Sequence, residues 1–246
     1  MGFMKKKIVC EYNPDTKSSF SIRVKKRLIS KKSKYQTIKI YQSEKFGNVL
    51  MIDGCFMFTE KDHHFYHGKC SELITSKKVI RNILIIGGGD FGLVKQLSSR
   101  KNIQSITLVE IDKVVTDSCK DYFPNFFNIR KSFMKKIKIF YDDGYDWVKD
   151  NDKQFDLVIV DTTDPVGCAK KLFTKRFYKY VFNVLNINGI YIQQSGSPLI
   201  HHKKIIEPMI KDLGNVGFKN ITINPFIMPS YPLGAWSFMR CERRSN

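Results

Sequence analysis

Five short apolar segments that alternate with helical stretches constrain the fold of this chain more than any other feature. They begin near residue 80, and the stretches between them carry apolar residues at helical spacing, as in 177–185. Strands that alternate with helices build a parallel sheet covered by helices on both faces. We therefore predict an α/β fold whose strands are 82–86, 105–109, 136–140, 155–160 and 189–193.

The first 70 residues have a different character. Segments of alternating polarity, 37–41 and 48–52, are separated by turn residues, among them Gly47 and the pair Asp53-Gly54. This pattern predicts a small antiparallel β domain over residues 1–70 and a larger α/β domain over residues 71–246. Residues 1–30 contain no motif from which a function can be predicted.

Size and composition indicate a soluble cytoplasmic protein. The chain has 246 residues, of which 42% are hydrophobic, enough for one main core with a small appendage. It has no run approaching the roughly 20 apolar residues that span a bilayer, and no secretory signal, so we expect no membrane partner. The six cysteines are scattered and lack metal-binding spacing, which favours reduced thiols in the cytoplasm.

The chain is strongly basic. Its formal net charge is +19, from 42 basic and 23 acidic residues. A basic protein can bind nucleic acid, but here the basic residues are spread along the whole chain. We interpret them as a solvated surface and expect no nucleic-acid partner.

A glycine-rich loop directly follows the first predicted strand of the α/β region. Residues 87–92 read Gly-Gly-Gly-Asp-Phe-Gly, so Gly87 and Gly89 allow a sharp turn and a close approach of a ligand to the backbone. Glu110 ends the second strand about 20 residues downstream, where a carboxylate can accept hydrogen bonds from both ribose hydroxyls. These residues fit a dinucleotide as well as a sulfonium nucleoside.

Asp90 distinguishes these two ligands. In a dinucleotide site the loop presents backbone N–H groups to a pyrophosphate, and a carboxylate there would place like charges close together. A cationic tail would instead be attracted, although Asp90 could also merely cap the next helix. The third strand leads into Asp143 and Gly144, where a carboxylate can accept a hydrogen bond from an adenine amino group. The set favours a cationic nucleoside.

Two further carboxylates, Asp161 and Asp164, follow the fourth strand. Ligands of open α/β sheets bind at the carboxyl ends of the strands, so these acids are well placed for function. A turn at Asp164-Pro165 explains part of this sequence, but not both acids together with Asp90 and Glu110. We therefore expect a carboxylate cluster that receives a cationic second substrate.

Taken together, these motifs resemble the spermidine synthase family of aminopropyltransferases. The resemblance extends in family order over roughly residues 33 to 240. It rests on the segments 33–36, 46–54, 59–62, 65–67, 87–90, 109–112, 143–144, 161–167 and 229–232.

The resemblance implies a small N-terminal antiparallel β domain on a class I methyltransferase-like, Rossmann-like domain. It further implies a polyamine aminopropyltransferase that uses decarboxylated S-adenosylmethionine as co-substrate, with no prosthetic group. Putrescine would be the acceptor, and spermidine and methylthioadenosine the products. The family also suggests homodimers or homotetramers formed through the β domain.

The resemblance also assigns residues to the two substrates. On the donor side, Gln36 and Asp90 would face the tail and sulfur, Glu110 the ribose, and Asp143 the adenine. The diamine pocket would be lined by Tyr66, Asp161, Asp164 and Tyr231, with His67 and Trp236 nearby. We expect Asp161, hydrogen-bonded through Tyr66, to hold the attacking nitrogen and accept its proton, while Asp164 anchors the distal ammonium.

Three positions depart from the family pattern. Phe91 replaces the usual glycine and should make the loop bulkier beside the donor. Gly68 replaces a glutamate, which removes one carboxylate from the rim of the pocket, and Cys168 replaces a proline in the loop that covers the site. His63 and His64 lie near His67, but adjacent residues point apart, so we expect no metal site.

Other enzyme classes remain as alternatives. An N-methyltransferase that uses S-adenosylmethionine on a small amine would share this fold, although Asp90 disfavours a donor with a carboxylate. A nucleic-acid methyltransferase would use the basic surface, but the chain lacks an Asn-Pro-Pro-Tyr-type motif and a Pro-Cys nucleophile. A non-catalytic polyamine-binding relative has only Phe91 and Gly68 in its favour.

Overall fold

The computed structural model describes residues 7–74 and 79–245. Its strands are β1 (Lys7–Asn13), β2 (Ser18–Lys32), β3 (Thr37–Ser43), β4 (Asn48–Ile52), β5 (Cys55–Thr59), β6 (Asn82–Gly87), β7 (Ser105–Glu110), β8 (Ile137–Tyr141), β9 (Phe155–Asp161), β10 (Leu185–Gln194), β11 (Lys219–Ile227) and β12 (Ala235–Glu242). Its α-helices are α1 (His63–Glu72), α2 (Gly92–Leu97), α3 (Lys113–Tyr122), α4 (Pro124–Phe127), α5 (Lys131–Met134), α6 (Gly144–Lys149), α7 (Lys175–Val184) and α8 (Glu207–Val216). Short helices of other types are η1 (Gly167–Phe173), η2 (His202–Ile206) and η3 (Pro232–Gly234).

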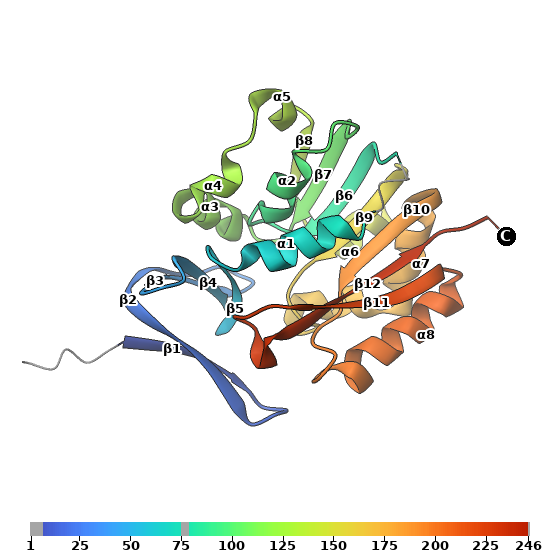
Figure 1. Cartoon of the computed structure of the whole chain (residues 1–246). Coiled ribbons are helices and arrows are strands. Elements are labelled where there is room, and N and C mark those ends of the chain that lie inside the picture. Colours follow the sequence, from blue (N-terminus) through green and yellow to red (C-terminus); the bar gives the residue numbers. More distant parts are fainter. Residues whose placement is uncertain (1–6, 75–78, 246) are drawn as a thin grey trace, which may run out of the picture.

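The larger sheet has seven strands in the order β11-β12-β10-β9-β6-β7-β8 (Figure 1). The pairs that join β10, β9, β6, β7 and β8 are parallel, whereas β12 and β11 are antiparallel to their neighbours. The predicted parallel sheet is therefore confirmed, and all five predicted strands are present. The antiparallel pair β11 and β12 was not predicted from the sequence.

Along the parallel strands, alternate side chains pack on opposite faces of this sheet. Ile83 and Ile85 of β6 belong to a core shared with α1, α2 and α3, whereas Leu84 and Ile86 belong to a core shared with α6, α7 and α8. A strand that is buried on both faces must be apolar throughout. This explains why these segments read as continuous apolar runs.

The smaller sheet has five antiparallel strands in the order β1-β2-β3-β4-β5. Ile38, Ile40 and Leu50 on one face join the main core, while Ile22 and Val49 on the other face form a separate cluster. The small sheet is thus packed directly onto the α/β body. The predicted boundary near residue 70 stays a prediction, and residues 1–6 of that domain lie outside the described residues.

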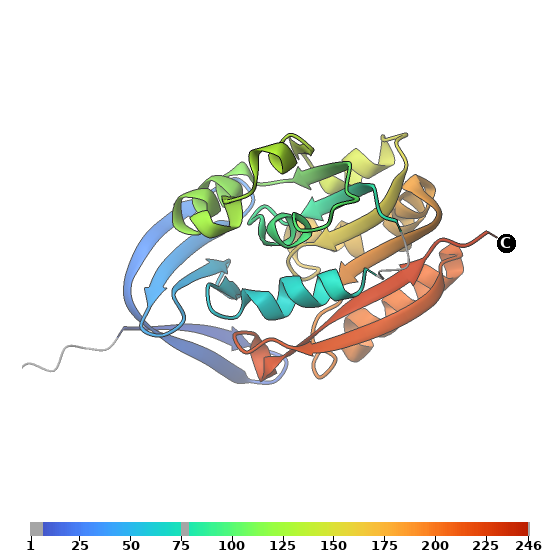
Figure 2. The same cartoon turned by 45° about the horizontal axis from the view of Figure 1, so that its top comes forward.

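The carboxyl ends of the parallel strands point toward the small sheet, as the arrowheads in Figure 2 show. In register, Gly87 at the end of β6 lies level with Asp161 at the end of β9, and Glu110 at the end of β7 lies level with Tyr141. Residues that follow these strands therefore meet at one edge. Among the helices of the described segments, none is both long and apolar enough to cross a membrane.

Candidate active site

Two adjoining cavities lie at this edge. The first, here called the glycine-loop cavity, is lined by Gly87, Asp90 and Glu110 among others and spans about 950 Å³, which includes space open to solvent. The second, the Asp164 cavity, is lined by Asp164 and Trp236 among others and spans about 990 Å³, again with space open to solvent. Both are lined by Gln36, Tyr66, Thr163 and Tyr231, so they are neighbours. Every residue predicted for the site lines at least one of them: Gln36, Tyr66, His67, Gly87, Gly89, Asp90, Glu110, Asp143, Gly144, Asp161, Asp164, Tyr231 and Trp236.

The glycine loop allows the end of β6 to approach its neighbours closely. Gly87 has φ +79°, and a Cβ atom there would lie 2.0 Å from the backbone oxygen of Asp161. A Cβ at Gly89 would lie 2.7 Å from Oε2 of Glu110. Side chains at these positions would collide with the site, so glycine is required.

Glu110 is buried beside this loop. Its Oε2 accepts a hydrogen bond from the backbone N–H of Gly89 at 3.1 Å, and its Oε1 accepts one from Asp112 at 2.9 Å. Burial raises the pKa of Glu110 to about 7, although both N–H donors favour the charged form. A pair of ribose hydroxyls would supply further hydrogen bonds to this carboxylate.

Asp90 directs its two oxygens to different partners. Oδ1 accepts a hydrogen bond from the backbone N–H of Gly92 at 2.6 Å, and Oδ2 lies 3.7 Å from Nε2 of the buried His67. Burial acts against ionisation, but the nearby His67 and the Gly92 N–H hold the pKa of Asp90 below its usual range. Asp90 therefore presents a negative charge to the cavity.

Two other residues that are predicted to bind the aminopropyl donor already interact with side chains or backbone groups of the protein. Asp143 accepts a hydrogen bond from the backbone N–H of Tyr145 at 2.9 Å as the N-cap of α6, and its Oδ2 lies 2.5 Å from Nζ of Lys171. Nε2 of Gln36 donates to Asp112 at 3.0 Å. Both side chains still line the glycine-loop cavity, but their roles toward a ligand stay predictions.

Asp161 lies at the end of β9 and lines the glycine-loop cavity, while the next residues, Thr162 and Thr163, line both cavities. The hydroxyl of Tyr66 donates to its Oδ1 at 2.6 Å, whereas Oδ2 is buried and has no hydrogen-bond partner among the described residues. Burial and the charge of Asp90 raise the pKa of Asp161 to about 6, against the opposing influence of His67 and Tyr66. A buried carboxylate oxygen without a donor is costly, so Oδ2 is ready to receive one from a substrate.

The Asp164 cavity brings together segments that lie far apart in the sequence. Oδ1 of Asp164 lies 3.5 Å from Nε2 of Gln194, and Oε1 of Gln194 accepts a hydrogen bond from Nε1 of Trp236 at 3.2 Å. The hydroxyl of Tyr231 donates to the backbone oxygen of Met57 at 2.5 Å. Burial raises the pKa of Asp164.

Sequence reasoning missed two residues of this cavity. Glu11 on β1 lines it, accepts a hydrogen bond from the backbone N–H of Phe56 at 2.6 Å, and has a pKa raised to about 7 by burial. No motif in residues 1–30 marks Glu11. Gln194 could have been found, because it ends β10 and polar residues at the carboxyl ends of parallel strands are candidates for ligand binding.

The three residues that differ from the family pattern lie in different places relative to the two cavities. The buried Phe91 ring belongs to the main core and stacks on Phe127 at 4.4 Å, with φ +69° at its backbone, and it lines neither cavity. The expectation that Phe91 crowds the donor is therefore wrong. Gly68 lines neither cavity, whereas Cys168 lines both. All six cysteines are free.

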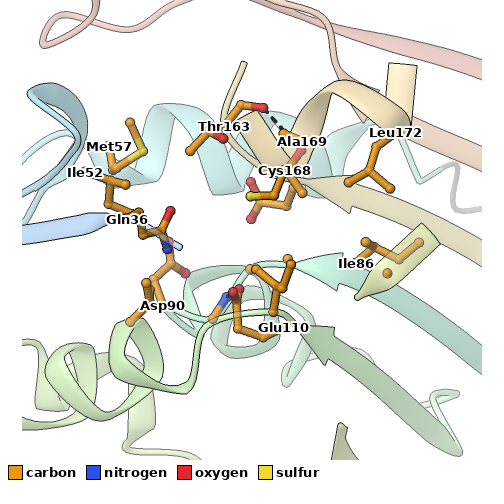
Figure 3. A pocket seen from close by; sticks show the side chains of 18 of the residues that line it. Gln36, Ile52, Met57, Ile86, Asp90, Glu110, Thr163, Cys168, Ala169 and Leu172 are labelled. Carbon is orange, nitrogen blue, oxygen red and sulfur yellow. Dashed lines mark hydrogen bonds between the residues drawn. The ribbon is translucent and has the colours of Figure 1, made fainter. Parts of the chain in front are cut away.

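Figure 3 shows the open space at the centre of the glycine-loop cavity. Glu110 faces Cys168 and Thr163 across this space, with Gln36 and Asp90 on one side. Among residues 7–74 and 79–245, His67, Asp90 and Asp161 form a group. One ring nitrogen of His67 and one carboxylate oxygen from each aspartate lie within 4.8 Å of one another. This group suits a positive charge, because it combines two carboxylates with one histidine.

Comparison with known protein families shows which family this chain belongs to. Residues 63–246 match the family model described as the spermine/spermidine synthase domain, and residues 9–60 match the spermidine synthase tetramerisation domain. The chain belongs to the spermine/spermidine synthase family. The polyamine aminopropyltransferase of Methanocaldococcus jannaschii is 38% identical over 229 residues, which cover 93% of this chain and 77% of that protein. The corresponding protein of Thioalkalivibrio sulfidiphilus is 38% identical over 235 residues, covering 94% and 82%. The present chain is thus an aminopropyltransferase.

Solved structures of this family have the same fold. A spermidine synthase in complex with the transition-state analogue AdoDATO has a TM-score of 0.90 at 24% identity, with 99% of this chain and 82% of that chain covered. The spermidine synthase of Thermotoga maritima has a TM-score of 0.89 at 23% identity, covering 99% and 81%. The predicted fold, with its small N-terminal antiparallel sheet, is confirmed.

Proposed function

We propose that this aminopropyltransferase moves the aminopropyl group of decarboxylated S-adenosylmethionine to putrescine, giving spermidine and methylthioadenosine. The single observation that carries this proposal is Asp161 in the glycine-loop cavity, whose Oδ2 is buried without a partner among the described residues and whose Oδ1 is held by Tyr66, a residue that lines both cavities. The donor would occupy the glycine-loop cavity and the diamine the Asp164 cavity. The relative with AdoDATO bound supports the choice of donor.

The reaction is a displacement at carbon. The amine nitrogen forms a bond to the aminopropyl carbon next to sulfur, and the C–S bond breaks with its electron pair going to sulfur. The sulfonium thereby becomes a neutral thioether, so the leaving group needs little help from the protein. The protein must instead align the two substrates and provide a neutral amine.

Asp161 would provide this neutral amine. An alkylamine has an unperturbed pKa near ~10.4, so it enters mostly protonated. With its pKa raised to about 6 by burial, Asp161 is ionised at neutral pH, and Oδ2 can accept the proton that the nitrogen loses. Tyr66 would fix the carboxylate through its hydrogen bond to Oδ1.

The other acids would bind charge that does not react. Asp164 and Glu11 lie in the cavity away from the glycine loop, where they can hold the distal ammonium of the diamine. Glu110 would accept the ribose hydroxyls, and Asp90 would attract the cationic tail of the donor. A donor that retained its carboxylate would be repelled by Asp90, which disfavours the methyltransferase alternative.

The experiment supplies the purified enzyme with putrescine and either decarboxylated or ordinary S-adenosylmethionine. We expect methylthioadenosine and spermidine in equal amounts with the decarboxylated donor only. Adenosylhomocysteine from the ordinary donor would identify a methyltransferase and contradict the proposal. Replacing putrescine by diamines one carbon shorter and longer would show whether the position of Asp164 selects acceptor length.

We also propose that the chain assembles as a homodimer or homotetramer through its N-terminal sheet, in the cytoplasm. The match of residues 9–60 to the tetramerisation domain supports the assembly. So do the exposed apolar side chains of Ile8 and Tyr12 on the edge strand β1, since such edges invite pairing. The free cysteines fit a reducing compartment.

A further inference from the structure

His63 forms a link to the active site that the proposed chemistry does not use. It lies one turn before His67 on α1, so the two rings share a face of the helix. Their Nδ1 atoms are 3.4 Å apart. The opposite nitrogen of His67, Nε2, lies 3.7 Å from Oδ2 of Asp90. His67 therefore bridges His63 and the carboxylate that faces the donor.

The His67 ring is held in this orientation by its surroundings. It is buried, its Cε1 lies so close to Gly92 that a Cβ there would be 1.9 Å away, and it packs against Phe58 and Phe126. His63 packs edge-on against Phe126, with ring centroids 4.6 Å apart, and is only partly buried. His63 is thus the more exposed member of the pair.

Protonation of the two histidines differs. Burial, together with the charge of His67, lowers the pKa of His63 to about 4, so His63 is neutral at neutral pH. Burial also opposes the charge on His67, but Asp90 and Asp161 outweigh it and raise the pKa of His67. When His67 carries its proton, both ring nitrogens are donors, and a neutral His63 can accept at Nδ1. The titratable groups that face this pair are Asp62, His64, Tyr66, Asp90 and Asp161.

We propose that His63 is a positioning residue. By accepting a hydrogen bond from Nδ1–H of His67, it stabilises the protonated His67 that pairs with Asp90. The protonated His67 then competes with the cationic tail of the donor for Asp90. Donor binding therefore requires that His67 lose its proton. The inference rests on the proposed function, since it needs the donor tail at Asp90.

Replacing His63 tests the hydrogen bond directly. In His63→Phe the ring can still pack on Phe126 but accepts no hydrogen bond, so the protonated His67 loses stabilisation. We expect the pKa of His67, followed by imidazole NMR in the ligand-free protein, to fall by roughly one pH unit. The rise of the donor KM toward low pH should move down by the same amount, with kcat little changed.

Two variants serve as controls. His63→Asn keeps an acceptor near the Nδ1 position and should restore the wild-type pH profile. His64→Phe changes the exposed next residue, whose ring lies edge-on to His63, and leaves the His63–His67 hydrogen bond in place. An unchanged His67 pKa in His63→Phe, or an equal fall in His63→Asn, would overturn the proposal. If His63→Phe does not fold, His63→Leu replaces it as the variant without an acceptor. Absence of aminopropyl transfer by the wild type would contradict the proposed function, whereas the NMR titration tests His63 independently of turnover.

Discussion

The two cavities of this enzyme are built in different ways. In the glycine-loop cavity, Glu110 and Asp90 accept hydrogen bonds from backbone N–H groups that lie at most 21 residues away, those of Gly89 and Asp112 for Glu110 and that of Gly92 for Asp90. The Asp164 cavity is assembled from more distant segments, for example by the hydrogen bond from the backbone N–H of Phe56 to Glu11, which are 45 residues apart. Glu110 and Asp90 are thus fixed by strand-loop-helix geometry within the α/β body, whereas the Asp164 cavity depends on how the small sheet and the C-terminal hairpin pack.

This difference has a consequence for charge. Two backbone N–H groups favour the ionised form of Glu110, although burial still raises its pKa to about 7, and His67 with the Gly92 N–H holds the pKa of Asp90 below its usual range. In the Asp164 cavity, Asp164 has only a long contact with Gln194, and Glu11 accepts from a single backbone N–H. An incoming ammonium would therefore meet carboxylates with few donors of their own, which suits a site that binds and releases a dication.

The largest effect is expected at Asp161 in the glycine-loop cavity. Asp161→Asn removes the proton acceptor while keeping the shape, and we expect kcat to fall by about 10²–10⁴ with the donor KM little changed. Steady-state kinetics with both substrates varied would measure it. Asp152→Asn, at an exposed acid outside both cavities, is the matched control. Near wild-type turnover in Asp161→Asn would remove Asp161 from the mechanism.

Two single substitutions, one in each cavity, sharpen the comparison of the two cavities. Glu110→Gln should raise the donor KM about 10- to 100-fold through the loss of charge-assisted hydrogen bonds, with the acceptor KM unchanged. Glu11→Gln should do the reverse, raising the acceptor KM about 3- to 10-fold. Because the pKa of Glu11 is raised to about 7 by burial, the effect of Glu11→Gln should appear above pH 7 and vanish below pH 6. An effect of both variants on the same KM would contradict the assignment of the cavities.

The smallest effect is a change in pH dependence. Tyr66 donates to Asp161 and so favours its ionised form, against the burial that raises its pKa to about 6. Tyr66→Phe should raise this pKa further, so the acid limb of kcat should move up by roughly half to one pH unit. Tyr180→Phe, at a tyrosine outside both cavities, should leave the limb in place. A limb that stays fixed in Tyr66→Phe would show that another group sets it.

Three of the strands that the sequence did not predict have a weak sequence pattern. β1 and β2 carry many exposed charged and polar residues, and β11 is largely exposed, so none reads as a buried apolar run. Phe91 shows the converse error. Its position in the glycine loop predicted a bulky group beside the donor, but its left-handed backbone and the aromatic ring of Phe127 place it in the core.

By itself, the sequence determined the parallel sheet and the acids that follow its strands. Buried parallel strands must be apolar, and the acids at their ends then share one edge of the sheet. Only the tertiary structure decided that Glu11 and Gln194 join Asp164, and that His63 contacts His67 beside Asp90. Such contacts depend on how separate elements pack, and the spacing of residues along the chain carries no record of that packing.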